Sequence, residues 1–166
     1  MNAAEFSVRV ATPADARAVS DVLSASYSTL YRGWYRDDVL ERALPAMTRA
    51  RPELLLSGLY FVAEQSGRIL ACGGWSRASP GGGAEAGRGH IRHFGTHPDH
   101  INRGCAGAIL QRCLDEARTA RLAGMECLSS LTAEAFYARH GFNTIAAASA
   151  TIGGTPFACM LMRRAF

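Results

Sequence analysis

The sequence contains no lysine, and all 18 of its basic residues are arginine. Together with the many alanines, this usage is typical of a GC-rich coding bias and is no functional signal by itself. The arginines are scattered, and only Arg163 and Arg164 are adjacent. The formal net charge of +4 therefore favours an anionic partner, but it forms no basic stripe of the kind that binds nucleic acid. We expect no nucleic-acid partner.

Long hydrophobic runs are also missing from the sequence. No stretch approaches the roughly 18 consecutive apolar residues that a membrane helix requires. The N-terminal segment contains Glu5 and no early basic cluster, which is unlike a secretory signal. These absences predict a soluble cytoplasmic protein that has no membrane partner.

The cysteines lack the spacing of a metal or redox site. There are five of them, an odd number, and none forms a C-x-x-C pair. We expect buried free thiols in a reducing compartment and no metal cofactor. The five residues are Cys72, Cys105, Cys113, Cys127 and Cys159.

The length and composition are those of a single compact domain over residues 1–166. Domains usually have about 100–200 residues, and 48% apolar against 19% charged residues is enough to build a core. This balance excludes a disordered tail or a disulfide-stapled miniprotein. One low-complexity stretch, residues 78–89, reads ASPGGGAEAGRG. It is too poor in apolar side chains to order itself, so we expect a flexible loop inserted within the domain.

Hydrophobic periodicity and turn residues predict a β-α-α-β-β-β-α-β-α-β-β order of elements. A Thr12-Pro13 start opens the first helix, Pro45 indicates a break or kink in the second, and Gly124 is expected to end the third. Strands are predicted at residues 6–10, 59–65, 68–75, 91–96, 125–128, 145–150 and 157–162. Helices are predicted from residue 13 onward and at residues 37–48, 103–123 and 133–140.

The most informative segment is residues 96–110, THPDHINRGCAGAIL. A strand ends, a short polar loop follows, and very small residues open an amphipathic helix. Small residues there let an anion reach the unpaired N–H groups of the first helical turn, so the segment is suited to bind a pyrophosphate. The alternative is that the small residues only allow close helix packing. The segment is neither a P-loop nor a G-x-G-x-x-G fingerprint.

At this point the chain resembles the GCN5-related N-acetyltransferase (GNAT) superfamily. The acyl-CoA motif of that family, [QR]-x-x-G-x-[GA], is similar to Arg103-x-x-Ala106-x-Ala108, with alanine at the position where the family prefers glycine. The residues in front of it, Phe94-Gly95-Thr96-His97-Pro98, are similar to the strand and H-P loop that precede the family's motif.

A second segment, residues 130–142, is similar to the family's N-x-x-A-x-x-[FLI]-Y-x-x-x-G-F pattern, and only Ser130 departs from it. The two motifs and their surroundings cover roughly residues 59–164. The resemblance implies an α/β fold of the α+β type with the GNAT acyl-CoA-binding architecture. Its central sheet would be mixed, mostly antiparallel and twisted, with about seven strands flanked by about four helices. It also implies acetyl-CoA as co-substrate and a possible homodimer.

The resemblance assigns roles to particular residues. Tyr137 would lie beside the CoA sulfur and protonate the departing thiolate, since a phenol and a thiol have similar pKa values; the alternative is a core tyrosine. An N–H at the end of the fourth strand would polarise the thioester carbonyl. The cofactor-binding residues would be Phe94, Gly95 and Thr96 for the pantetheine arm, Arg103, Gly104, Cys105, Ala106, Gly107 and Ala108 for the pyrophosphate, and Ser130.

The general base is less defined. Many family members carry a glutamate on the fourth strand, and the matching position here is Arg92. His93 is our first candidate for the base, because it is on the same strand. His90, Glu126 and Glu64 are the other titratable candidates, and water acting without a dedicated base is a further alternative.

The predicted function is transfer of an acetyl group from acetyl-CoA to a primary amine of a small molecule or peptide, by direct attack in a ternary complex. The aromatic stretch Tyr27–Tyr35 either lines the acceptor cleft or packs in the core. The alternative function is a catalytically weak CoA-binding sensor or partner-binding module on the same fold. A cysteine hydrolase that uses Cys105 or Cys127 is a third hypothesis, although the sequence around them contains no nucleophile signature.

Overall fold

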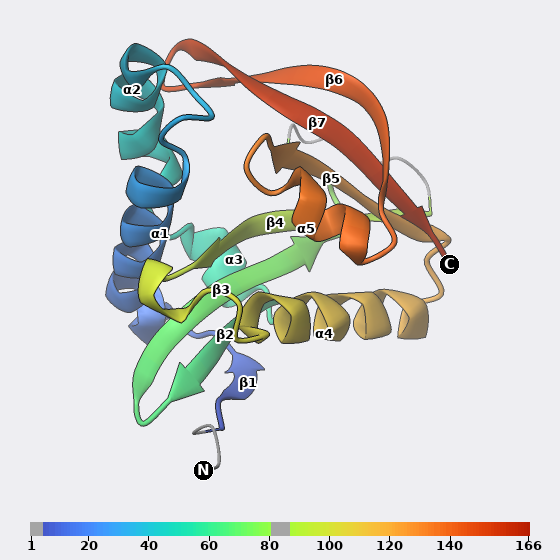
Figure 1. Cartoon of the computed structure of the whole chain (residues 1–166). Coiled ribbons are helices and arrows are strands. Elements are labelled where there is room, and N and C mark those ends of the chain that lie inside the picture. Colours follow the sequence, from blue (N-terminus) through green and yellow to red (C-terminus); the bar gives the residue numbers. More distant parts are fainter. Residues whose placement is uncertain (1–4, 81–86) are drawn as a thin grey trace.

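The computed structural model describes residues 5–80 and 87–166, which form one seven-stranded sheet with helices on both faces (Figure 1). The strand order is β1-β2-β3-β4-β5-β7-β6. The strands are β1 (Ser7–Val10), β2 (Tyr60–Gln65), β3 (Arg68–Ser76), β4 (Arg88–Thr96), β5 (Gly124–Ser130), β6 (Asn143–Ile152) and β7 (Thr155–Ala165). The α-helices are α1 (Ala16–Leu30), α2 (Asp37–Met47), α3 (Pro52–Leu56), α4 (Cys105–Thr119) and α5 (Glu134–Arg139), with 3-10 turns at Pro13–Asp15 and Pro98–His100.

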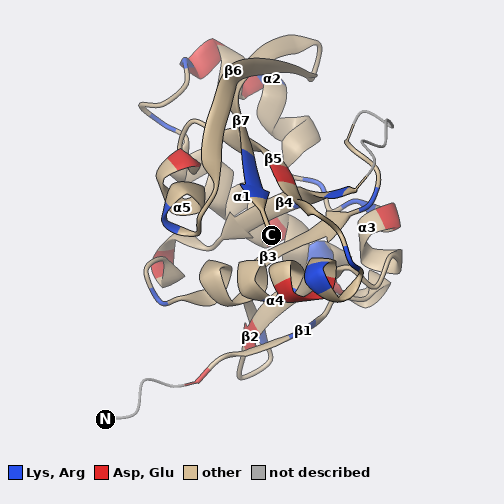
Figure 2. Ribbon diagram, turned by 90° about the vertical axis from the view of Figure 1, so that its right-hand side faces the viewer, with Lys and Arg blue, Asp and Glu red and all other residues tan. Residues whose placement is uncertain are grey.

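All strand pairs are antiparallel except β4 and β5, which run parallel. The sheet is thus mixed and mostly antiparallel, as predicted. Two separate apolar clusters cover its faces: α4 and the tyrosine of α5 belong to one, and α1 and α2 belong to the other. Charged positions of both signs alternate over the ribbon without a continuous basic stripe (Figure 2).

The first predicted helix start is correct. The Asp15 carboxylate accepts a 2.8 Å hydrogen bond from the Thr12 N–H and two of 2.9 Å from the Arg9 guanidinium. These contacts satisfy an N–H group at the helix start and place an acid near the positive end of the helix dipole. The Ser66-Gly67 hairpin turn is also confirmed, with positive φ at both residues (51° and 76°).

Several predicted boundaries were wrong. Helix α2 has nearly the predicted bounds but is not broken at Pro45 and continues to Met47, because a proline in the last turn removes only one hydrogen bond, on an exposed side of the helix. Helix α4 ends at Thr119, well before Gly124, since Arg121 already takes the left-handed conformation (φ 59°). Gly124 instead begins β5. The short helix α3 was not predicted.

The predicted loop at residues 78–89 is also too long. Arg88 and Gly89 belong to β4 and pair with Gly124 and Met125 of β5. Residues 81–86 of that loop lie outside the described residues. All five cysteines are free and buried, as expected. In the described part of the chain, no helix is both long and apolar enough to cross a membrane.

Candidate active site

The site begins where β4 and β5 separate. The register pairs only Arg88, Gly89 and His90 of β4 with Gly124, Met125 and Glu126 of β5. Beyond that point β4 remains paired with β3, while β5 follows β7 as far as Ser130. A parallel pair that opens in this way leaves main-chain groups on both inner edges without a strand partner. The end of β4, where the resemblance implies contacts with the pantetheine arm, therefore has no register partner on β5.

A cavity of about 740 Å³ occupies this opening. Its lining reaches both faces of the sheet, because it includes Tyr27 of α1 and Tyr31 just after that helix, as well as Ala106 and Gly107 of α4. Two molecules can thus approach one point from opposite faces of the sheet. Of the predicted site residues, the lining includes His93, Phe94, Gly95, Thr96, Gly104, Cys105, Ala106, Gly107, Ser130 and Tyr137.

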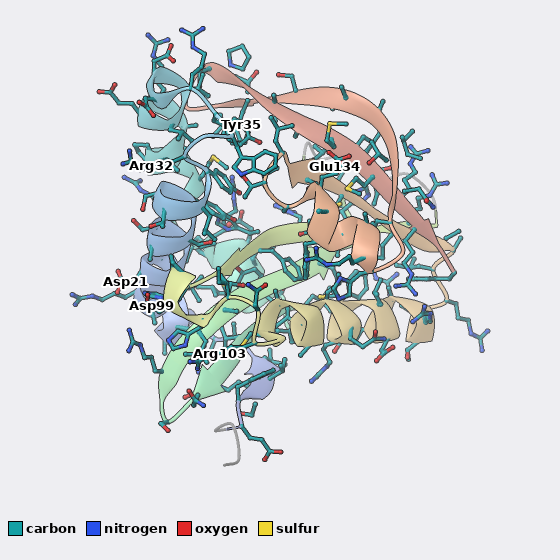
Figure 3. The ribbon with its side chains drawn as sticks, viewed as in Figure 1. Asp21, Arg32, Tyr35, Asp99, Arg103 and Glu134 are labelled. Atoms are coloured by element: carbon teal, nitrogen blue, oxygen red, sulfur yellow. The ribbon has the colours of Figure 1, made fainter. Side chains whose placement is uncertain are left out.

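Two predicted cofactor-binding residues, Arg103 and Ala108, are not part of the cavity lining. Arg103 is exposed in the turn before α4 (Figure 3). The Ala108 N–H donates to the Gly104 carbonyl at 2.9 Å, so it is already engaged within the helix. Of the motif, only the middle residues, Gly104 to Gly107, line the cavity.

The start of α4 is shaped to hold an anion. Gly104, the N-cap, has φ 84°, a conformation that favours glycine. Among the described residues, no main-chain carbonyl is a partner of the N–H groups of Cys105, Ala106 or Gly107, and all three residues line the cavity. These N–H groups and the helix dipole favour negative charge at one end of the cavity, which fits a pyrophosphate.

Strand β4 bulges at His93. His93 and Phe94 together face Gly73 of β3, and His93 has φ 55°. A Cβ atom at Gly73 would lie 2.5 Å from the Phe94 ring, so the close approach requires glycine. The two carbonyls of the bulge are satisfied by phenols: Tyr60 donates to His93 at 2.6 Å and Tyr27 to Phe94 at 2.5 Å.

The bulge changes which face the side chains take. Ile91 packs in the cluster on the α4 side, whereas the His93 ring contacts the Met47 carbonyl at the end of α2. A Cβ at Gly95 would meet Leu23 of α1 at 2.9 Å. Because side chains alternate in a strand and the extra residue breaks that alternation, Arg92 and His93 both lie on the α1–α2 side.

Tyr137 lies on α5 in an aromatic environment. Its ring makes edge contacts with Phe94, Phe136 and Phe142, at centroid distances of 6.2, 5.1 and 5.5 Å. Burial raises the pKa of Tyr137 well above its usual value, and nearby Cys127 adds to the effect. The phenol therefore remains protonated across the physiological range and is available only as a proton or hydrogen-bond donor.

Two further phenols extend this group across the cavity. The Tyr27 and Tyr31 rings stack at a centroid distance of 4.7 Å. Burial raises the pKa of Tyr31, although a hydrogen bond with the Ser130 side chain partly offsets it. Of the aromatic stretch Tyr27–Tyr35, Tyr27 and Tyr31 thus line the cleft, whereas Tyr35, which donates to the Ala158 carbonyl at 2.7 Å, packs beside it.

The His93 imidazole is held in place by the protein. Its Nε2 lies 2.6 Å from the Met47 carbonyl, which requires the proton on Nε2. Its Nδ1 is buried and has no partner among the described residues. Burial, together with the charges of Arg51 and Arg92, lowers the pKa of His93 to about 4. Neither ring nitrogen opens onto the cavity in this conformation, so a role as general base stays a prediction.

The other candidate bases lie outside the large cavity. Glu64 accepts a 2.5 Å hydrogen bond from Arg9 at the β1–β2 end of the sheet. Glu126 accepts a 2.8 Å hydrogen bond from Arg163 and lies 3.8 Å from His90. His90 and Glu126 line a smaller cavity of about 230 Å³ between β4 and β5.

Three arginines and two histidines that were not predicted as site residues also line the cavity: Arg51, Arg92, Arg139, His100 and His140. Arg92 was noticed only as the residue at the family's glutamate position. His140 follows α5 and its Nε2 lies 3.2 Å from where a Cβ at Gly107 would be. Within residues 5–80 and 87–166, no group of three or more His, Cys, Asp or Glu side chains could hold a metal ion.

Comparisons with known proteins agree with this geometry. A family model described as "Acetyltransferase (GNAT) domain" matches residues 57–144. Among solved structures, a GCN5-related N-acetyltransferase from Rhodopseudomonas palustris has 20% identity and a TM-score of 0.82, covering 100% of this chain and 99% of the other. The search of curated proteins found no match.

Two further structures were crystallised with the coenzyme. The PaiA N-acetyltransferase from Thermoplasma acidophilum, in complex with coenzyme A, has 12% identity and a TM-score of 0.74, with 98% and 99% of the two chains covered. A GNAT family acetyltransferase from Brucella melitensis, in complex with acetyl-CoA, has 21% identity and a TM-score of 0.61, with 98% and 89% covered. At these identities the structures establish the fold, and the family model covers more than half of the sequence. The chain belongs to the GNAT acetyltransferase family.

Proposed function

We propose that this protein transfers the acetyl group of acetyl-CoA to a primary amine by direct attack in a ternary complex. The observation that carries the proposal is the cavity between the diverging ends of β4 and β5, which is open to both faces of the sheet and bounded by the start of α4. Acetyl-CoA supplies an activated acyl group as a thioester. The remaining requirements are binding, polarisation of a carbonyl and movement of two protons, which the chain's own residues can meet.

The cofactor end of the cavity is the start of α4. The N–H groups of Cys105, Ala106 and Gly107 would hold the pyrophosphate, and Arg139 and His140 line the same cavity. The edge of β4 from Phe94 to Thr96 would pair with the pantetheine arm. An N–H on this edge would polarise the thioester carbonyl. Ser130, at the end of β5, lies across the opening from this edge of β4.

Tyr137 is the proposed proton donor. As the amine nitrogen forms its bond to the acyl carbon, the C–S bond breaks and its electron pair leaves with sulfur, which takes the phenolic proton. Burial raises the pKa of Tyr137 because it disfavours the charged phenolate. A charged thiolate leaving group would be disfavoured by burial in the same way, which would favour transfer of the phenolic proton to sulfur as its charge develops.

The amine must lose a proton on the α1–α2 side. His93 is the proposed base if its ring turns away from the Met47 carbonyl, and water is the alternative acceptor. The positive charges of Arg51 and Arg92 oppose protonation of His93. The same charges would lower the pKa of a bound ammonium ion and favour the neutral amine that attacks. The five free thiols support a reducing compartment such as the cytoplasm.

A CoA-binding sensor remains the second candidate, because Ala106 and Ser130 depart from the family motifs. Ala106→Glu tests the shared step, since it places a negative charge at the proposed pyrophosphate site. We expect at least a tenfold increase in the Kd for CoA by calorimetry. Gln111→Glu, an equal charge change on the exposed side of α4, is the control and should leave the Kd within about twofold. Equal Kd values in both variants would contradict binding at this helix.

A further inference from the structure

The large cavity is lined by charged side chains of one sign, the positive one. Of the described residues that line it, three are arginines (Arg51, Arg92 and Arg139) and none is aspartate or glutamate. Arg139 is at the end of α5, on the side proposed for the cofactor phosphates. Arg51 and Arg92 are on the other side, near α2 and α3, where no phosphate of the cofactor is expected. A second anion would be needed to balance them.

Arg92 is placed on that side by the bulge of β4. Its guanidinium donates a 3.0 Å hydrogen bond to the Ser76 hydroxyl. In the described part of the chain it forms no ion pair with a carboxylate. Burial lowers the pKa of Arg92, and the nearby positive charge of Arg51 lowers it further. A half-buried arginine without an acid partner is costly unless a ligand supplies the counter-charge.

The positive charge of Arg51 is only weakly compensated by a carboxylate. Its nearest carboxylate is Glu53 at 3.7 Å, and both side chains are more than half exposed, at 54% and 63%. An exposed pair of this kind contributes little and exchanges readily. Glu53 does not line the cavity. Two guanidinium groups therefore face one partly solvated carboxylate, which leaves a net positive charge at the α1–α3 end of the cavity.

We propose that the acceptor is a small primary amine that carries a carboxylate, which Arg92 binds with help from Arg51. This inference rests on the proposed transferase function and names the substrate class for the same site. The planar guanidinium fork matches a carboxylate in two parallel hydrogen bonds. Diamines are disfavoured, because no described lining residue offers a carboxylate to a second ammonium ion.

The geometry also limits the length of the acceptor. Arg92 is three residues before Gly95 on β4, and a strand rises about 3.3 Å per residue, so the two positions are roughly 10 Å apart or less at the bulge. The Arg92 guanidinium donates to Ser76, which pairs with His90, so its side chain is directed away from Gly95 and does not shorten this distance. The acceptor can therefore carry its amine and its carboxylate several bonds apart, as in an ω-amino acid.

The test compares matched acceptors with the purified full chain and acetyl-CoA. Pairs of an amino acid and its carboxamide, 4-aminobutyrate among them, and 1,4-diaminobutane are assayed by release of free thiol. We expect kcat/KM for the carboxylate member to exceed that for the carboxamide by about tenfold to a hundredfold, as for a charge-assisted hydrogen bond. Equal values, or a preference for the carboxamide or the diamine, would overturn the inference while leaving a transferase.

Substitutions of Arg92 test whether this residue causes the preference for the carboxylate. Arg92→Gln should bring the carboxylate-to-carboxamide ratio close to one, mainly through KM, and Arg92→Lys should give an intermediate ratio because it keeps the charge but loses the fork. A purely structural role through Ser76 would lower both activities equally and leave the ratio unchanged, which would overturn the assignment. Arg49→Gln is the control, since Arg49 is exposed and outside the cavity lining.

A binding measurement separates this inference from the proposed function. If no amine is acetylated, the transferase proposal is contradicted, and the inference is judged by calorimetric titration of the CoA-saturated protein with the same pairs. Tighter binding of the carboxylate member, lost in Arg92→Gln, would uphold the anion site. Equal or no binding of both members would overturn it.

Discussion

The hydroxyl of Tyr60 donates a 2.6 Å hydrogen bond to the main-chain carbonyl of His93, the residue at which β4 bulges. Tyr60 comes from β2, so this contact crosses β3 and fixes the bulge from two strands away. The bulge in turn directs Arg92 and His93 to one face and Phe94 to the other. The shape of the cavity thus depends on a buried phenol that does not itself line it.

Tyr60→Phe should lower the free energy of unfolding by about 1–3 kcal/mol, because it leaves the His93 carbonyl without its donor in the interior. The ring and its packing are retained, so the loss reports the hydrogen bond. Urea denaturation followed by circular dichroism measures it. A loss below about 0.5 kcal/mol would mean that another donor replaces the phenol.

Tyr137→Phe should lower kcat by about 100-fold and leave the Kd for CoA within twofold, since it removes only the proton donor. The control is Tyr35→Phe, which removes another buried hydroxyl: Tyr35 donates to the Ala158 carbonyl and accepts from the Leu131 N–H at 2.8 Å. That variant should be less stable but keep its kcat. Unchanged kcat in Tyr137→Phe would remove Tyr137 from the mechanism.

His93 makes stability depend on pH. Its folded pKa of about 4 is below the value of about 6.5 in the unfolded chain, so the unfolded state takes up the proton first as the pH falls. This contribution is complete above pH 6.5 and is lost between pH 6.5 and 4. From pH 7.5 to 5 we expect a loss of about 2 kcal/mol that is absent in His93→Gln, whose amide can still donate to Met47.

Unfolding in urea at the two pH values measures this difference. The window stays above pH 5 because the pKa of Asp15 is lowered by its hydrogen bond with Arg9, so that ion pair is lost only at more acid pH. The same loss in His93→Gln as in the unmodified chain would show that the His93 imidazole is not buried as a neutral group.

Cys105→Ala should keep kcat and the Kd for CoA within about threefold. Burial raises the pKa of the Cys105 thiol, which keeps it protonated and a poor nucleophile. The thiol-release assay and calorimetry measure both quantities. Loss of turnover with unchanged CoA binding would revive a covalent mechanism through this cysteine.

Much of the fold could be predicted from the sequence because local signals agreed with the final structure. The β2–β3 hairpin had alternating apolar residues around Ser66-Gly67, and α4 had apolar residues at helical spacing. The expected position of the pantetheine arm at the end of β4 and the proposed role of Tyr137 came from the resemblance to the family. Periodicity alone carries no information about where two parallel strands stop pairing.

The parts that could not be predicted depend on contacts between distant residues. The alternation of β4 suggests opposite faces for Arg92 and His93, and only the bulge held by Tyr60 and Tyr27 puts them on the same face. Arg51 is far from Arg92 in sequence, so their shared position in the cavity is visible only in the structure. Helix α3, from Pro52 to Leu56, is too short to produce a hydrophobic periodicity in the sequence.

The most direct test of the central claim is titration of the purified protein with acetyl-CoA, followed by measurement of free thiol on addition of primary amines. We expect saturable binding of acetyl-CoA, and thiol release that requires both acetyl-CoA and the amine. No binding of acetyl-CoA would contradict the assignment of the α4 start as the pyrophosphate site. Binding without thiol release on any amine would contradict the transferase and favour the sensor.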